Sequence, residues 1–400
     1  MTINQFLKNN YSIWLFLFIF LFAACSDDDG GSGGAQQATV KWKGNPTVST
    51  EKGSATLSLE GTPGLTWQAE ITEGMDWCAF EYNFSGDASA VTKTGTLKEG
   101  VNALYIYFRA NNKPSQRTAK IQLTYAGGEP QVLQLTQVAA GEIVKPVLGN
   151  WPELPEQKQN ANYEYATHYA KLANGQKVRN FSLCYDKTKK NALWVAYPLH
   201  KAYIGGVGRT DAWEYDPYID EKYQPRLFGG FKTSGYDRGH QLPSGDRTGS
   251  VSLNEQTFYF SNMTPQMSRL NQDMWAKLEM KVRDDFNCSD TLYVVTGAHF
   301  ANTNKTAKDN SGVQIPVPTH YFKVFLRTKN GRTGKSVYDC KPSELISVGV
   351  WVEHKSYGNV APPKSVFMSV SAIEQKTGHK FFPHIDASVK QSFNPSDWNI

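Results

Sequence analysis

The chain has 400 residues, of which 40% are hydrophobic, 13% are aromatic and 20% are charged, and its formal net charge is +5. This length exceeds one ordinary hydrophobic core and predicts two domains, and the composition excludes a disordered or a multispan membrane protein. Residues 1–150 carry 11 Lys and Arg against 13 Asp and Glu, whereas residues 151–400 carry 31 against 24. The basic second part is compatible with a polyanionic ligand, and equally with ordinary surface charge.

The N-terminus predicts export. Lys8 precedes an apolar run, residues 13–24, which is too short to span a bilayer as a stable helix and is typical of a signal peptide. The run ends in Phe22-Ala23-Ala24-Cys25, which resembles the lipobox of bacterial lipoproteins with Phe22 where leucine is usual. The resemblance implies a signal peptide over residues 1–24, lipidation of Cys25 and attachment of the mature protein to the outer membrane.

The residues after Cys25 predict a tether. Residues 26–29 read Ser-Asp-Asp-Asp and are similar to the acidic export signal that directs some lipoproteins of Gram-negative bacteria to the cell surface. The alternative is a solvated spacer on a lipoprotein that faces the periplasm, and we favour the cell surface. Residues 30–37 are rich in glycine, so residues 25–37 are expected to be flexible.

Residues 38–139 predict a β-sandwich. Short runs with alternating hydrophobicity are separated by turn signals such as Gly-Thr-Pro-Gly at 61–64. The predicted strands are residues 55–59, 66–71, 103–108, 119–125 and 132–138. The segment around Thr66-Trp67, the Asp76-Trp77 pair and residues 117–121 resemble the BACON family. This resemblance implies an immunoglobulin-like module that either contacts glycans or acts as a spacer, and we favour the spacer.

Four cysteines remain when Cys25 is set aside: Cys78, Cys184, Cys288 and Cys340. None forms a CxxC pair, which argues against a structural zinc site. Export permits disulfides, but the spacing fixes no pairing and all four thiols are equally compatible with the free form. For Cys78 the simplest interpretation is a small residue packed in the core.

Residues 140–162 contain Pro146, Pro152 and Pro155 and predict a linker to a second domain over residues 163–400. The predicted strands there are residues 180–185, 192–197, 256–261, 291–296, 321–326 and 345–352. Helical periodicity is clearest in residues 270–286, and a second helix is expected over residues 371–377. Strands and helices without βαβ alternation favour the α+β class.

Three stretches of this domain carry residues suited to phosphodiester chemistry. Residues 236–241 read Tyr-Asp-Arg-Gly-His-Gln, residues 261–266 read Ser-Asn-Met-Thr-Pro-Gln, and residues 270–279 read Leu-Asn-Gln-Asp-Met-Trp-Ala-Lys-Leu-Glu. Hydrolysis needs a base to deprotonate water, and histidine serves near neutral pH. It also needs a cation near the scissile phosphate, and an Asn oxygen suffices to anchor Mg²⁺, which keeps most of its waters. Arginine pairs with phosphate oxygens.

Together these stretches resemble the DNA/RNA non-specific endonuclease family over about residues 180–385. Its signature is Asp-Arg-Gly-His, then Asn-x-x-Pro-Gln, then Leu-Asn-Gln-x-x-Trp-x-x-Leu-Glu, and all three occur here in order. The resemblance implies a ββα-metal motif on an antiparallel sheet. It also implies cleavage of DNA and RNA without sequence preference to 5′-phosphate products, with Mg²⁺ as cofactor and Mn²⁺ as a substitute. A homodimer is compatible with the family, but no part of the sequence indicates an interface.

The same resemblance assigns the central roles. His240 is the general base, and Asn271 is the direct Mg²⁺ ligand. Glu279, eight residues further along a regular helix and about 80° around it, would hydrogen-bond metal-bound water.

Four further residues are assigned to the phosphate. Arg238 and Asn262 would position or stabilise it, and Gln266 would line the site. Arg209, whose alignment crosses a variable region, would stabilise the transition state. Asp237 is expected to orient its neighbours.

Two rival hypotheses stay open. The domain could be a non-catalytic surface binder of nucleic acid or glycan, or a phosphodiesterase for small nucleotides. The intact set of His240, Asn271 and Glu279 argues against a simple binder. The other histidines form no metal motif and are predicted to be structural or on the surface; they are His168, His200, His299, His320, His354, His379 and His384.

Overall fold

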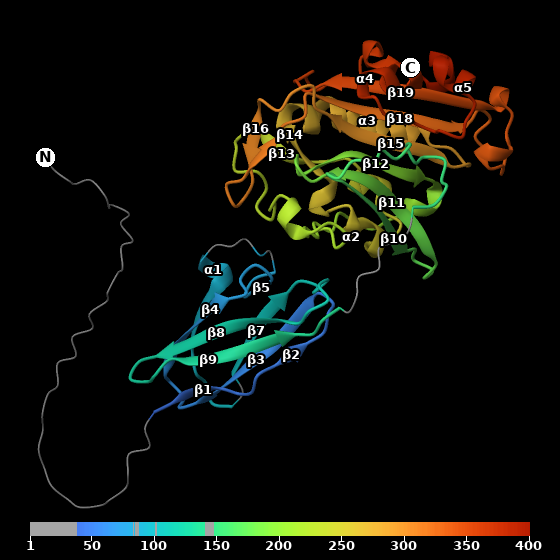
Figure 1. Ribbon diagram of the computed structural model, residues 1–400. Helices are drawn as coiled ribbons and strands as arrows, with labels where there is room; N and C mark the ends of the chain where they lie inside the picture. The colour runs from blue at the N-terminus through green and yellow to red at the C-terminus, as the bar shows by residue number, and fades with distance from the viewer. Residues whose placement is uncertain (1–37, 83, 85–87, 101, 141–147) are drawn as a thin grey trace, which may run out of the picture. The chain divides into compact units, whose positions relative to one another are not determined.

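The computed structural model describes residues 38–82, 84, 88–100, 102–140 and 148–400 (Figure 1). The predicted signal peptide, Cys25 and the tether lie outside the described residues, as does part of the predicted linker. Within the described part, no helix is both long and apolar enough to cross a membrane.

Residues 38–140 form two β-sheets with a common core. The strand orders are β1-β3-β7-β5 and β2-β9-β8-β4-β6. Alternate residues point inward, as in β8, where Ala119, Ile121 and Leu123 are fully buried. The elements are β1 Val40–Trp42, β2 Thr47–Val48, β3 Gly53–Gly61, β4 Thr66–Glu73, β5 Cys78–Ala79, α1 Ala88–Val91, β6 Thr92–Thr96, β7 Asn102–Phe108, β8 Arg117–Tyr125 and β9 Gln131–Gln137.

The core of this part joins residues of both sheets, including Leu57 and Ile106 from one and Ile121 and Leu133 from the other. The two sheets therefore pack face to face. All five strands predicted from the alternation are present in β3, β4, β7, β8 and β9, although β9 ends one residue before the predicted end. Cys78 is fully buried in this core, as predicted.

Residues 148–400 are built on a seven-stranded sheet with the order β10-β11-β12-β15-β18-β19-β20. All neighbouring strands in it are antiparallel. Five of the six predicted strands fall in this sheet. Its strands are β10 Tyr163–Lys171, β11 Lys177–Asp186, β12 Asn191–Leu199, β15 Leu292–His299, β18 His320–Thr328, β19 Leu345–Glu353 and β20 Phe367–Met368. A mixed fold built mainly on antiparallel strands is thus confirmed.

The sixth predicted strand, residues 256–261, is wrong. Ser250 caps the helix α2 (Val251–Gln256) by accepting a hydrogen bond from the Leu253 amide, and a 3₁₀ turn, η4 (Phe260–Asn262), follows. Phe258 and Phe260 are fully buried. The alternating aromatic residues therefore fill the core from consecutive turns, not from a strand.

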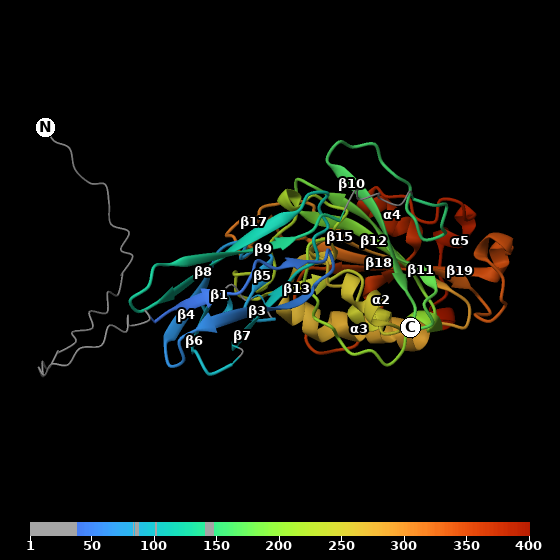
Figure 2. The same cartoon turned by 90° about the horizontal axis from the view of Figure 1, so that it is seen from below.

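Helical elements cover both faces of the large sheet, and Figure 2 shows α3 and the pair α4 and α5 on opposite sides of it. On one face, Leu270, Met274, Leu278 and Val282 are buried against the sheet, so the predicted four-residue periodicity is confirmed. This helix is not a regular α-helix: η5 (Leu270–Trp275) and η6 (Val282–Phe286) are π-helical turns around α3 (Ala276–Lys281). Helices α4 (Val370–Thr377) and α5 (Ala387–Gln391) cover the other face, α4 as predicted.

Two small two-stranded antiparallel sheets complete the domain. They are β13 (Tyr236–His240) with β14 (Met263–Met267), and β16 (Thr306–Lys308) with β17 (Gln314–Pro316). The remaining short turns are η1 Lys201–Tyr203, η2 Glu221–Tyr223, η3 Ser244–Arg247, η7 Val337–Asp339, η8 Pro342–Glu344, η9 Lys364–Val366 and η10 Pro395–Trp398. The four described cysteines are free, so no disulfide links them.

Candidate active site

The Asp-Arg-Gly-His segment forms β13, which pairs with β14 in antiparallel register. Asp237 lies opposite Gln266, and Gly239 lies opposite Thr264. A Cβ atom on Gly239 would approach Oε1 of Gln266 to 2.4 Å. Glycine is therefore required here, because a larger residue would displace the Gln266 side chain.

Asp237 is the centre of a group of amide and hydroxyl donors, which we call the amide cluster: Asp237, Gln266, Ser268, Asn271 and Gln272. One carboxylate oxygen accepts from Ser268 Oγ at 2.7 Å. The other accepts from Asn271 Nδ2 at 2.9 Å and from Gln272 Nε2 at 2.8 Å. Because the Asn271 nitrogen is held by Asp237, its amide oxygen is left for another ligand. Asp237 thus orients its neighbours, as predicted.

Gln266 brings unsatisfied polar atoms to the amide cluster. Its side chain is only 1% exposed, and neither Nε2 nor Oε1 has a hydrogen-bond partner. Buried polar groups without partners are rare in folded proteins, and such a group is free to bind a ligand. Gln266 is therefore suited to line a binding site.

His240 lies at the end of β13 against two aromatic rings. Its ring centroid is 5.7 Å from that of Trp213 and 5.1 Å from that of Phe258. The imidazole bonds to the Arg238 backbone, while Nε2 is buried and has no partner. Burial, and then the charges of Arg209 and Arg238, lower the pKa of His240 to about 3, although the bond to the Arg238 backbone raises it. The imidazole is thus neutral at physiological pH, with a lone pair on Nε2.

The two predicted arginines lie near His240, and we call His240, Arg238, Arg209, Trp213 and Phe258 the base cluster. Arg238 donates from Nη1 to the carbonyls of residues 227 and 228, at 2.8 and 2.9 Å. The Arg209 guanidinium lies 4.7 Å from the Phe258 ring centre. Burial, and then Arg209, lower the pKa of Arg238 to about 10. Two cations beside a neutral imidazole form a site for an anion.

Asn262 requires a correction. Its side chain is fully buried, and its Oδ1 accepts from the Leu242 amide at 2.9 Å. Its Nδ2 donates to the carbonyls of Leu242 and Thr257, at 3.0 and 2.7 Å. The expected phosphate contact is contradicted, because the amide is committed to the backbone. Asn262 instead fixes the chain that follows His240.

Glu279 is partly exposed and lies among charged residues of other elements. Burial raises the pKa of Glu279 to about 7, partly offset by Lys323, and the nearby Asp246 raises it further. Lys323 is 1% exposed, and Asp246 is bound by the Tyr197 hydroxyl and by Arg283, each at 2.9 Å. Among the described residues, no hydrogen bond or ion pair joins Glu279 to Asn271 or His240.

The helix that carries Asn271 and Glu279 is not regular. Asp273 interrupts the helix with φ −101° and ψ −105°, so the ideal angular spacing does not apply between positions 271 and 279. Asp237 and His240 lie three residues apart on the same strand, β13. The strand therefore connects the amide cluster and the base cluster.

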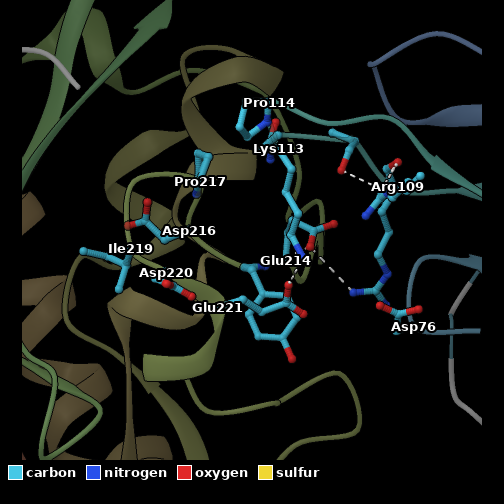
Figure 3. Close-up of a pocket in the computed structure, with 14 residues that line it drawn as sticks. Asp76, Arg109, Lys113, Pro114, Glu214, Asp216, Pro217, Ile219, Asp220 and Glu221 are labelled. Atoms are coloured by element: carbon cyan, nitrogen blue, oxygen red, sulfur yellow. Dashed lines mark hydrogen bonds and ion pairs between the residues drawn. The ribbon is translucent and has the colours of Figure 1, made fainter. Parts of the chain in front are cut away.

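Two histidines predicted to be structural are confirmed as such. His354 accepts from the Met267 amide at 2.7 Å and bonds to the Pro318 carbonyl, which fixes the end of β14. His168 is buried and lies 3.0 Å from Asp216, which also accepts from Ser261 Oγ. Figure 3 labels Asp216 in the pocket-lining segment 214–221. The serine hydroxyl bonds to the carboxylate and not to the imidazole, so this set holds η4 in place.

The sequence interpretation missed Trp213 and Lys323. Trp213 follows Arg209 by four residues, and Lys323 lies within the apolar run of β18. A charged residue inside a buried strand was the available signal for Lys323. Trp213 gave no local signal, because its contacts join segments distant in sequence.

The part of the chain that carries these residues is similar to known proteins. Residues 159–388 match the family described as DNA/RNA non-specific endonuclease. The chain is 27% identical over 219 residues to a nuclease of Nostoc sp., covering 54% of this chain and 76% of the relative. It is 29% identical over 225 residues to mitochondrial endonuclease G of Homo sapiens, covering 54% and 71%.

A nuclease of Syncephalastrum racemosum is 31% identical over 227 residues, covering 52% of this chain and 67% of the relative. The family match over residues 159–388 contains the two clusters and the large sheet. The chain therefore belongs to the DNA/RNA non-specific endonuclease family and is a nuclease, a hydrolytic enzyme.

Proposed function

We propose that this protein is a sugar- and sequence-non-specific endonuclease that hydrolyses DNA and RNA with a divalent cation, leaving 5′-phosphate ends. The observation that carries the proposal is the base cluster, in which an unpartnered, uncharged His240 nitrogen lies beside two arginines. Arginines that bind the backbone phosphate read neither sugar nor base, which accounts for a lack of preference.

His240 is the proposed general base. Its neutral Nε2 accepts a proton from the attacking water, and Arg238 and Arg209 hold the phosphate oxygens. Bound phosphate neutralises the cations that depress the imidazole pKa. The pKa of His240 then rises only in part, because burial, the larger cause of its depression, remains. The base still becomes stronger when substrate is present.

The residues present fit a hard divalent cation. No group of three or more His, Cys, Asp or Glu side chains able to hold a metal exists in the described ranges, which disfavours a zinc-type site. Asn271 offers an oriented amide oxygen, and Gln266 has unpartnered buried polar atoms nearby on β14. We assign Asn271 as the ligand of Mg²⁺, with Mn²⁺ as a substitute. When bound, the cation would stabilise charge on the phosphate and on the leaving oxygen.

Glu279 stays in the proposal as an acceptor that orders water near the cation. Its raised pKa means that it ionises near neutral pH. Lys323 and Arg283 favour the ionised form, which is the form able to accept hydrogen bonds.

The direct experiment incubates the full-length protein in detergent with plasmid DNA and with RNA. Cleavage of both in Mg²⁺, its loss in EDTA, and products that accept label only after phosphatase treatment are expected. Intact plasmid with gel retardation in Mg²⁺ would favour the rival non-catalytic binder. Hydrolysis of a small diester alone would favour the phosphodiesterase.

We further propose that the protein is an outer-membrane lipoprotein at the cell surface, anchored through Cys25. The lipobox-like segment supports this proposal. A Cys25→Ser variant is expected to lose metabolic labelling by fatty acid, and protease added to intact cells is expected to digest the parent protein. Labelling that persists in the variant contradicts the anchor.

We also propose that residues 38–139 are a BACON-like, immunoglobulin-like module that acts as a spacer. The two-sheet arrangement and the motif residues support this. Tyr82 and Tyr105 are 69% and 60% exposed, so a glycan contact is the alternative to test. If residues 38–139 are retained on a panel of immobilised glycans, the module binds glycans and is not a simple spacer.

A further inference from the structure

Trp213 lies between the catalytic residues assigned above, and no motif identifies it. The Arg238 guanidinium carbon lies 3.5 Å from the centre of the Trp213 ring. His240 lies on the same ring system at 5.7 Å, and Arg209 lies 5.6 Å from it. One indole therefore contacts the base and both cations of the base cluster.

The contact with Arg238 restrains the guanidinium. Its Nη1 is occupied by two backbone carbonyls, and one face of its plane is covered by the indole. A cation over an aromatic face is attracted electrostatically, and guanidinium stacks well on tryptophan. The Arg238 guanidinium is thus restrained at one edge by hydrogen bonds and at one face by the indole.

The backbone fixes the position of Trp213 itself. Its amide donates to the Asp211 carbonyl at 2.8 Å, and Asp211 adopts a left-handed conformation with φ 49°. Asp211 also accepts from Arg209 Nε at 2.8 Å. The next residue, Glu214, accepts from the Phe260 amide at 2.9 Å. One short segment therefore positions Arg209 and Trp213 together and connects them to the chain before Asn262.

Phe258 completes the enclosure of His240. The Trp213 and Phe258 rings meet edge to face, with centroids 4.8 Å apart and an interplanar angle of 89°. His240 meets Phe258 at 88°. The two rings contact the imidazole on two sides, which accounts for the buried Nε2 atom.

We propose that Trp213 is a positioning residue of the nuclease site, which orients Arg238 for the phosphate and encloses His240. The inference rests on the proposed function. A planar aromatic ring is what this position requires, so phenylalanine would preserve the role and an aliphatic residue would not.

The test compares Trp213→Leu and Trp213→Phe with the parent, with Trp351→Leu as a matched control. Trp351 also contacts histidines, His299 and His320, and the cation Lys376, but none of these residues belongs to the site. Plasmid and oligonucleotide cleavage are measured on the full chain in Mg²⁺, well below each melting temperature. The parent is assayed first. An inactive parent refutes the proposed function, whereas an active parent allows the variants to test the role of Trp213.

Trp213→Leu is expected to lower kcat/KM by about 2- to 30-fold, the range of one cation–π contact. Trp213→Phe is expected to restore most of that loss, and Trp351→Leu is expected to retain the parent rate. An active parent with a Leu variant equal to it would overturn the inference, as would a folded Phe variant as impaired as the Leu variant. If the Leu variant does not fold, Trp213→Met replaces it with the same expectations.

Discussion

His240 and His320 lie in the same domain and each packs against a tryptophan with a cation nearby. His320 stacks on Trp351 at 4.7 Å and 24°, and Lys376 lies 5.3 Å from the same ring. His240 meets Trp213 at 5.7 Å, and that ring also contacts Arg209 and Arg238. The residue types are thus alike, and the difference between the two sites lies in their hydrogen bonding.

His320 Nδ1 has a partner in the Thr319 hydroxyl at 3.1 Å, and its ring is about half-buried. His240 Nε2 is buried and has none. A histidine–tryptophan contact alone therefore does not identify a reactive site. At His240 an unsatisfied buried nitrogen lies beside two arginines that can bind an anion, and this arrangement is unfavourable until a ligand arrives.

The largest expected effect is that of His240→Ala. Loss of a general base should lower kcat by about 10²–10⁴-fold while the fold is retained. His320→Ala is the matched control and should cleave plasmid at the parent rate. Initial rates and circular dichroism of both variants check this. Equal losses in the two variants would remove the distinction between the sites.

The next largest effect concerns the residue that orients the metal ligand. Asp237→Asn weakens the hold on the Asn271 amide and should lower activity or cation affinity on the order of 10–100-fold, as for other groups that orient ligands. Asp220→Asn is the control, because Asp220 is an exposed aspartate that accepts from a backbone amide outside the amide cluster. Mg²⁺ titration of the cleavage rate measures both. Unchanged half-saturation in Asp237→Asn with full activity would exclude the amide cluster as the cation site.

Removal of Arg209 tests the electrostatics of the base cluster. The Arg209 charge contributes to the lowered pKa of His240, so Arg209→Ala should move that pKa upward towards 6.5. A base acts when it is deprotonated. A higher pKa of His240 therefore narrows the pH range of activity from its acidic side. Histidine NMR titration of parent and variant measures the change. A His240 resonance that titrates identically in both would place Arg209 outside the site.

The smallest expected effect lies at His379, outside the base cluster. Its side chain is 7% exposed, and burial, then Lys158 and His299, lower its pKa to about 4. Because the folded pKa lies below the unfolded value, the neutral ring supports stability above pH 6.5, and that contribution is lost as the pH falls from 6.5 towards 4. The loss is at most about 1.4 kcal/mol per pH unit. Urea unfolding of the parent and of His379→Gln at pH 7 and pH 5 measures this loss. Between the two pH values, the free energy of unfolding should fall less in the variant than in the parent.

Much of the site could be predicted because its residues are contiguous. The Asp-Arg-Gly-His segment lies on one strand, and the spacing of Leu270, Met274, Leu278 and Val282 identified the helix that packs beside it. The wrong predictions lie where tertiary contacts, and not local sequence patterns, decide the secondary structure. Residues 256–261 alternate like a strand but turn to bury Phe258 and Phe260.

The roles of individual polar residues were harder to predict. Asn262 occupies a motif position, yet its amide is saturated by the backbone. Trp213 belongs to no motif, and its importance depends on Arg238 and His240, which lie more than twenty residues further along the chain. Hydrogen-bond saturation and long-range stacking leave no periodic trace in a sequence.

Chemical rescue of His240→Ala tests the central claim most directly. The full-length variant is given an oligonucleotide in Mg²⁺ with increasing imidazole, and single-turnover cleavage is measured at several pH values. If His240 is the base, free imidazole should restore the rate by about tenfold or more, in proportion to its unprotonated form. A folded variant that cleaves as fast as the parent without imidazole, or that imidazole does not accelerate, contradicts the account.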